Sequence, residues 1–129
     1  MSQENVERVR AGFAAYNRGD LDTLLDMYGP TVEFVTLLQG NHHGKEAVRL
    51  MFEENRRNLP GYRLEPEELI DVGDGQVIAV VHLGGAGRVS QVALDDRIAF
   101  LFTIQDGLSI RQQSFRNKED ALEAVGLRE

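Results

Sequence analysis

The hydrophobic periodicity of this 129-residue chain changes once, near Tyr62. Before that residue, apolar side chains recur at spacings of three and four, which is typical of amphipathic helices. After it, the pattern becomes extended, with short apolar runs separated by glycine-containing turn signals. Helices followed by antiparallel strands favour a single α+β domain over residues 1–129, with helices packed in the concave face of a strongly bent, mainly antiparallel sheet. Such an arrangement encloses a pocket between helices and sheet.

Three helices are predicted in the first half of the chain. Ser2 and Asp20 are suitable N-caps for the first two, because a side-chain oxygen can accept a free amide hydrogen of the first turn. Gly19 ends the first helix, and Gly29 with Pro30 ends the second. The predicted apolar stripes are Val6, Val9, Phe13 and Tyr16, then Leu21, Leu24, Leu25 and Tyr28, and in the third helix Val48, Met51, Phe52 and Asn55.

One strand is predicted at residues 31–35, followed by a loop at 36–44. Four further strands follow Tyr62 in meander order, with turns at Asp74-Gly75, near Ser90-Gln91, and at Asp106-Gly107. The segment Val77–Leu83 is nearly all apolar, which predicts a central strand covered on both faces. Asn117 caps a last helix that carries Ala121, Leu122 and Val125.

The charge balance argues against nucleic acid as a partner. Lys and Arg total 14 against 21 for Asp and Glu, and a net charge of -7 repels phosphate backbones. The chain has no cysteine, so it forms no disulfide and no thiolate metal site, and we expect a cytoplasmic location. No window approaches the roughly 20 apolar residues that a membrane span needs, and no membrane partner is expected.

Several motifs carry a resemblance to a known family. The stretch from Phe13 to Asp22 resembles the opening signature of SnoaL-like proteins, an aromatic helix end followed by Asn-x-Gly-Asp. The other similar segments are Val32–Phe34, Gly44–Val48, Leu69–Asp74, and Asp106-Gly107 followed by Ala121–Leu127. The chain therefore resembles the nuclear-transport-factor-2-like superfamily in its SnoaL-like branch, within a bacterial subgroup of mostly unassigned function.

The resemblance implies a cone-shaped α+β barrel and a homodimer built through the outer face of the sheet. Relatives in this superfamily include polyketide cyclases, steroid isomerases, epoxide hydrolases and non-catalytic binding modules, so the fold does not choose a function. The residues do not supply the isomerase or cyclase groups. The isomerase's general base aligns with Phe34 and its first-helix tyrosine with Gly12, while the cyclase carboxylate region reads Arg111–Phe115, without an acid.

Asp96 is the candidate catalytic residue. In the predicted strand Val92–Ile104, even positions are apolar except for Asp96, so period-two alternation places this carboxyl on the inner face. Desolvation there would raise its pKa into a range useful for acid–base work. The alternative is a carboxylate at the barrel rim, solvated or ion-paired within the Asp95-Asp96-Arg97 cluster.

Aromatic and polar side chains supply the candidate binding residues. We expect them to be Phe13, Tyr16, Phe34, His43, Met51, Phe52, Phe100, Phe102, Arg111 and Gln113. Ordinary core packing is the alternative for the aromatic residues, and solvent exposure is the alternative for His43. His42 and His43 are adjacent, which does not fit a four-ligand zinc site, so no metal or cofactor is predicted.

Three functions remain open from the sequence. The first is binding of a small, largely apolar or carbonyl-containing molecule, because the inner face is aromatic with few ionisable groups. The second is a pocket enzyme of isomerase, cyclase or epoxide hydrolase type that uses Asp96. The third is an interaction module without an open pocket.

A homodimer through the outer face of the sheet is also expected. Ala93, Ala99 and Leu101 occupy outward positions on the strand Val92–Ile104, where a solvated face should alternate to charge. If the helices cover only the inner face, these side chains form an exposed apolar patch, which two-fold pairing would bury.

Overall fold

The protein is described by a computed structural model covering residues 2–37, 40–58, 61–84 and 96–126. Four helices are present in this part of the chain: α1 (Ser2–Asn17), α2 (Leu21–Leu25), α3 (Lys45–Asn58) and α4 (Lys118–Ala124). Two predicted N-caps are confirmed: Asp20 Oδ1 accepts from the Thr23 amide at 3.1 Å, and Asn117 Oδ1 accepts from the Asp120 amide at 2.8 Å. The helix starts therefore follow from local chemistry.

Six strands form one mixed sheet in the order β2-β1-β6-β5-β4-β3. Their bounds are β1 (Tyr28–Val35), β2 (Asn41–His43), β3 (Arg63–Gly73), β4 (Gln76–Gly84), β5 (Asp96–Gln105) and β6 (Leu108–Phe115). Strands β3 to β6 pair antiparallel in meander order, and β1 joins β6 in parallel. The predicted α+β class with a mainly antiparallel sheet is confirmed.

Two predicted hairpin turns are present. Asp74 and Gly75 have φ values of 56° and 75° between β3 and β4, and Asp106 and Gly107 have φ values of 52° and 80° between β5 and β6. Two consecutive residues with positive φ twist the chain as a tight hairpin requires, which explains the Asp-Gly sequence at both places. The predicted turn near Ser90-Gln91 lies outside the described residues.

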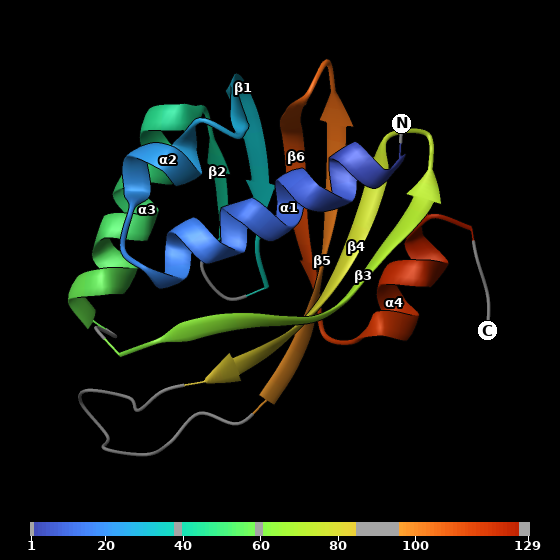
Figure 1. The fold of residues 1–129 in the computed structure, drawn as a ribbon. Helices are drawn as coiled ribbons and strands as arrows, with labels where there is room; N and C mark the ends of the chain where they lie inside the picture. The colour runs from blue at the N-terminus through green and yellow to red at the C-terminus, as the bar shows by residue number, and fades with distance from the viewer. Residues whose placement is uncertain (1, 38–39, 59–60, 85–95, 127–129) are drawn as a thin grey trace.

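The main core fills the concave side of the sheet, beneath α1, α2 and α3 (Figure 1). Helix α1 crosses the sheet and contributes Val9, Phe13 and Tyr16, which are buried against inward side chains of the strands. On β5 the inward row contains Phe100, Phe102 and Ile104, as alternation predicts. This packing leaves the wide end of the cone, near α3 and β1, as the place for a pocket.

Helix α4 lies on the opposite, outer face of the sheet. Ala121 and Leu122 pack there against Ile78, Ala99 and Leu101, and all five side chains are buried. The prediction that the helices cover only the concave side is therefore wrong for α4. The alternation that placed Ala99 and Leu101 outward is correct, but the chain covers these residues with its own last helix.

Several boundaries differ from the sequence-based expectation. The segment 36–44, predicted as a loop, contains strand β2, which pairs with β1 through Phe34 and His42. Strand β1 begins at Tyr28 because that residue already pairs with Ser109 of β6, and α2 ends at Leu25. Strand β4 is covered on both faces as predicted, yet it is second from the edge of the sheet and not central. In the part of the chain described, no helix has the length and apolar character needed to cross a membrane.

Candidate functional site

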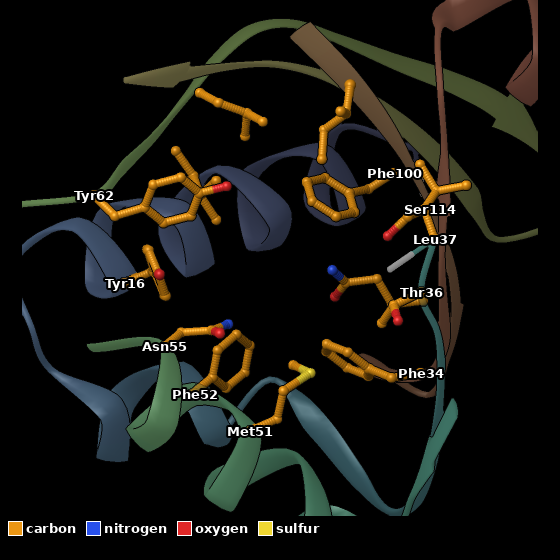
Figure 2. Close-up of a pocket in the computed structure, with 14 residues that line it drawn as sticks. Tyr16, Phe34, Thr36, Leu37, Met51, Phe52, Asn55, Tyr62, Phe100 and Ser114 are labelled. Carbon is orange, nitrogen blue, oxygen red and sulfur yellow. The ribbon is translucent and has the colours of Figure 1, made fainter. Parts of the chain in front are cut away.

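A cavity of about 300 Å³ lies at the wide end of the cone (Figure 2). It is enclosed by α1, α3 and the concave face of the sheet, and it opens beside Leu37, which is 47% exposed. The lining residues are Tyr16, Phe34, Thr36, Leu37, Met51, Phe52, Asn55, Tyr62, Leu64, Leu83, Ile98, Phe100, Gln112 and Ser114. The size is at the lower end of the roughly 300–1,000 Å³ typical of small-molecule sites.

Phe52 of α3 organises the aromatic side of the cavity. Its ring centroid lies 5.7 Å from that of Tyr16 and 5.7 Å from that of Phe34, and the Phe34 contact is edge-to-face. Helical spacing places Met51 and Phe52 on the inner face of α3, with Asn55 one turn further on. These rings are fixed by their mutual packing, so the apolar wall is largely preformed.

The end of α1 is tied to the sheet by a paired hydrogen bond. Asn17 Nδ2 donates to the Leu64 carbonyl and Asn17 Oδ1 accepts from the Leu64 amide, both at 2.8 Å. Arg56 of α3 also donates to the Tyr16 carbonyl, at 3.4 Å. These contacts hold Tyr16 against the cavity from two directions.

The ionisable groups among the described lining residues are two tyrosines, and both favour the neutral form. Burial raises the pKa of Tyr16 to about 12, and Tyr62 adds to this effect while Arg56 opposes it. Burial also raises the pKa of Tyr62, whose hydroxyl points toward the cavity (Figure 2). Near neutral pH both groups are phenols that donate or accept hydrogen bonds and carry no charge.

Five of the sequence-predicted binding residues line the cavity: Tyr16, Phe34, Met51, Phe52 and Phe100. Phe13 and Phe102 do not line it. They lie behind Phe100 in the core, with the Phe13 ring 6.0 Å from Phe100 and 5.9 Å from Phe102. Their contribution is to support the cavity wall.

His43, Arg111 and Gln113 are placed away from the cavity, which corrects the prediction that they contact a ligand there. Arg111 and His43 both lie opposite Glu33 on the outer face of the sheet, and Arg111 Nε is 3.4 Å from Glu33 Oε1. Gln113 pairs with Leu101, which faces α4. On β6 the inward row therefore consists of Gln112 and Ser114, one residue out of step with the prediction.

Asp96 begins β5 opposite Leu83, but its side chain lies outside the described part of the structure. The assignment of Asp96 as an acid or base stays a prediction, as does the alternative of a rim carboxylate. The two isomerase-equivalent positions do not supply acid–base groups: Phe34 lines the cavity, and a Cβ at Gly12 would overlap Met27 Sδ. A side chain at Gly12 would therefore require Met27 to move.

Several lining residues are absent from the predicted binding set. The polar ones are Thr36, Asn55, Tyr62, Gln112 and Ser114, and the apolar ones are Leu37, Leu64, Leu83 and Ile98. Arg111 carries the signal that could have identified Gln112 and Ser114 as lining residues. A charged side chain does not belong on the inner face of an apolar pocket unless an acidic partner lies there too. Arg111 and Gln113 therefore had to face outward, which leaves Gln112 and Ser114 on the inner face. Among the described residues, no cluster of three or more His, Asp or Glu side chains could hold a metal ion.

Comparisons with known proteins agree with this geometry. Residues 9–112 match the family model of the SnoaL-like domain. The chain belongs to the SnoaL-like family. An uncharacterized protein of Mycobacterium tuberculosis, Rv0034, is 35% identical to this SnoaL-like chain over 116 residues, which cover 86% of this chain and 87% of that protein.

Solved structures share the fold of this SnoaL-like protein. A nuclear-transport-factor-2-like protein of unknown function from Burkholderia pseudomallei has a TM-score of 0.80 at 19% identity, covering 98% of this chain and 99% of the other. TerC, co-crystallized with polyporic acid, has a TM-score of 0.78 at 22% identity, covering 95% of this chain and 98% of the other. The predicted superfamily and its SnoaL-like branch are confirmed.

Proposed function

We propose that this SnoaL-like protein binds a small, neutral, largely apolar molecule in the cavity between α1, α3 and the sheet. The observation that carries the proposal is the composition of the wall. Aromatic and aliphatic side chains dominate it, and its described polar groups are uncharged hydroxyls and amides. Such a lining favours apolar ligands and strongly disfavours ions, because a buried charge without a partner is costly.

Binding is better supported than acid–base catalysis. A proton-transferring group is most effective when its pKa lies near the working pH. Among the described lining residues the titratable groups are Tyr16 and Tyr62, and the pKa of each is raised further from neutrality. The cavity of about 300 Å³ also argues against an interaction module whose pocket is filled by its own side chains.

The comparison with TerC supports the same proposal. TerC was co-crystallized with polyporic acid, and its superposition with this protein covers 98% of the TerC chain. A protein of this shape can therefore be crystallized with a small organic molecule. We extend to this chain only the class of function, binding of a small organic molecule.

Thermal unfolding with bicyclic hydrocarbons tests the proposal. Indane, tetralin and naphthalene fit the size of the cavity and carry no hydrogen-bonding group. At about 100 times its dissociation constant, a ligand of the native state adds roughly 2.7 kcal/mol to the free energy of unfolding, which is a clear rise in Tm. We expect at least one of the three to raise Tm.

A matched pair of variants locates the binding. Ile98→Trp adds bulk at a side chain that lines the cavity and should abolish the Tm rise. Leu50→Trp adds the same bulk at a side chain of α3 that is 58% exposed, and it should leave the rise unchanged. The proposal is wrong if none of the three hydrocarbons shifts the Tm of the unaltered protein.

A further inference from the structure

The inner row of β6 places a primary amide inside the aromatic wall of the cavity. Gln112 is 7% exposed and pairs with Phe34 on β1 and with Phe102 on β5, so its side chain stands between two aromatic positions. A buried amide has two N–H donors and one carbonyl acceptor to satisfy. A donor or acceptor of this amide that has no partner within the chain therefore indicates which group a ligand would supply.

Tyr28 fixes the orientation of this amide. The Tyr28 hydroxyl, on a side chain only 2% exposed, donates to Gln112 Oε1 at 2.8 Å. Among the described residues Gln112 is the hydrogen-bond partner of that hydroxyl. If the amide were reversed, the Tyr28 hydrogen would have no acceptor inside the core, which is the costlier arrangement. The carbonyl oxygen of the Gln112 amide therefore faces Tyr28, and the amide nitrogen Nε2 points away from Tyr28.

The two hydrogens of Gln112 Nε2 have no acceptor among the described residues. In the same part of the chain, every side-chain nitrogen or oxygen that is fully closed off has a hydrogen-bond partner. Nε2 is therefore not closed off, and because Gln112 lines the cavity, the open space beside it is the cavity itself. An unpaired donor on a side chain that is only 7% exposed calls for an acceptor from outside the chain.

Ser114 supplies a second donor on the same wall. It lies two residues further along β6, on the same face and opposite Phe100, which places it roughly 7 Å along the strand from Gln112. Its hydroxyl points into the cavity (Figure 2) and has no partner among the described residues. Unlike the amide nitrogen, this hydroxyl can also accept, so it adapts to its neighbour.

We propose that Gln112 and Ser114 form a subsite for the carbonyl oxygen of a neutral, largely apolar ligand such as an aromatic ketone. This inference rests on the proposed function and deepens it by naming the polar group that the ligand carries. The N–H groups of Gln112 complement an acceptor and not a donor. A carboxylate is disfavoured, because the described lining residues include no cation to offset its charge.

The test compares two probes that differ by one carbonyl group, 1-tetralone and tetralin. Calorimetric titration of the unaltered protein should show that 1-tetralone binds about fivefold more tightly or better. The carbonyl stretching frequency of bound 1-tetralone should fall below its value in hydrocarbon solvent, because a carbonyl that accepts hydrogen bonds is weakened.

The double variant Tyr28→Phe with Gln112→Met removes the donor while keeping the shape of the wall. Replacing both partners of a buried hydrogen bond by apolar groups of similar shape can be nearly neutral for stability. We expect this variant to bind tetralin unchanged and to lose most of its preference for 1-tetralone. Ser114→Ala should lose part of the preference. Gln113→Met, on the outer face of the same strand, is the matched control and should retain it.

The outcomes separate the two proposals. Equal binding of the two probes, or a preference for 1-tetralone that survives in the double variant, overturns the carbonyl subsite and leaves apolar ligand binding intact. Failure of both probes to bind the unaltered protein overturns the subsite, and it overturns the proposed function as well if indane and naphthalene also leave the Tm unchanged. Tetralin binding by the double variant shows that its cavity is folded.

Discussion

At the scale of single residues, burial sets the tyrosines apart among the titratable groups that the structure describes. The chain has three, and burial raises the pKa of Tyr16, Tyr28 and Tyr62. Of the three tyrosine side chains, that of Tyr28 is the most buried, and its hydroxyl donates a hydrogen bond to Gln112 Oε1. Each native phenol therefore holds its proton more tightly than the same residue in the unfolded chain.

Stability should consequently fall as the solution becomes alkaline. The unfolded chain loses the Tyr16 proton near pH 10.0, while the folded protein holds it until about pH 12. The contribution is complete below pH 10 and is lost as pH rises toward 12, and for Tyr16 it amounts to roughly 2–3 kcal/mol. Urea midpoints measured across this range should decrease, and less steeply in Tyr16→Phe. Phenolate absorbance from all three tyrosines at pH 10 with native circular dichroism would contradict this.

Single residues also show what the sequence could and could not specify in the site. Tyr16, Phe34 and Phe52 follow from apolar periodicity, because inward faces of helices and strands are readable in that way. On β6, Arg111 and Gln113 were predicted to face the cavity, whereas Gln112 and Ser114 line it. The alternation of β6 is interrupted between Ser109 and Arg111, where the register with β5 shifts. A bulge changes which face each side chain occupies, and apolar periodicity does not reveal it.

At the scale of elements, α4 has the largest structural consequence. Its residues Ala121 and Leu122 cover Ile78, Ala99 and Leu101 on the outer face of the sheet. The helix, its N-cap and its apolar stripe could be predicted from the sequence. The stripe packs equally well on an apolar concave face or an apolar outer face of the sheet, so it does not determine which face α4 covers. Strand β2 was missed for a related reason: three residues are too few for a period to be recognised, and pairing with β1 creates the strand.

Truncating the apolar stripe of α4 should destabilise the whole domain. Leu122→Ala removes a side chain that is 5% exposed, and a cavity at such a site costs roughly 2–4 kcal/mol. Glu123→Ala alters the next residue, which is exposed, and should change stability by less than about 0.5 kcal/mol. Urea denaturation measures both. If Leu122→Ala were as stable as Glu123→Ala, α4 would not be packed on the sheet in solution.

At the scale of the whole molecule, the surface available for self-association differs from the expected one. Of the apolar outward residues that suggested a dimer, Ala99 and Leu101 are covered by α4 within the same chain, and Ala93 lies outside the described residues. What remains of the outer face beside β1 and β6 is a polar strip formed by Glu33, His43, Arg111 and Gln113. We propose that the homodimer implied by the family resemblance uses this strip.

An association through such a strip should be sensitive to salt. Within one chain Arg111 Nε lies 3.4 Å from Glu33 Oε1, and pairs that such exposed charges make across an interface are individually weak and screened at high ionic strength. Light scattering should therefore give about twice 14.4 kDa at low salt and a smaller average mass at high salt. Arg111→Glu should reduce the dimer fraction. A mass of 14.4 kDa under all conditions would rule out the dimer, and a salt-independent dimer would point to another surface.

The pairing of Tyr28 with Gln112 joins residues 84 positions apart in the chain. The β3–β4 and β5–β6 hairpins close over two-residue turns, whereas the parallel contact of β1 with β6 must close over most of the chain, at a greater entropic cost. Folding should therefore assemble the meander before it joins β1, so the cavity is completed late on the pathway. A molecule bound in the cavity should therefore slow unfolding while leaving the rate of folding almost unchanged.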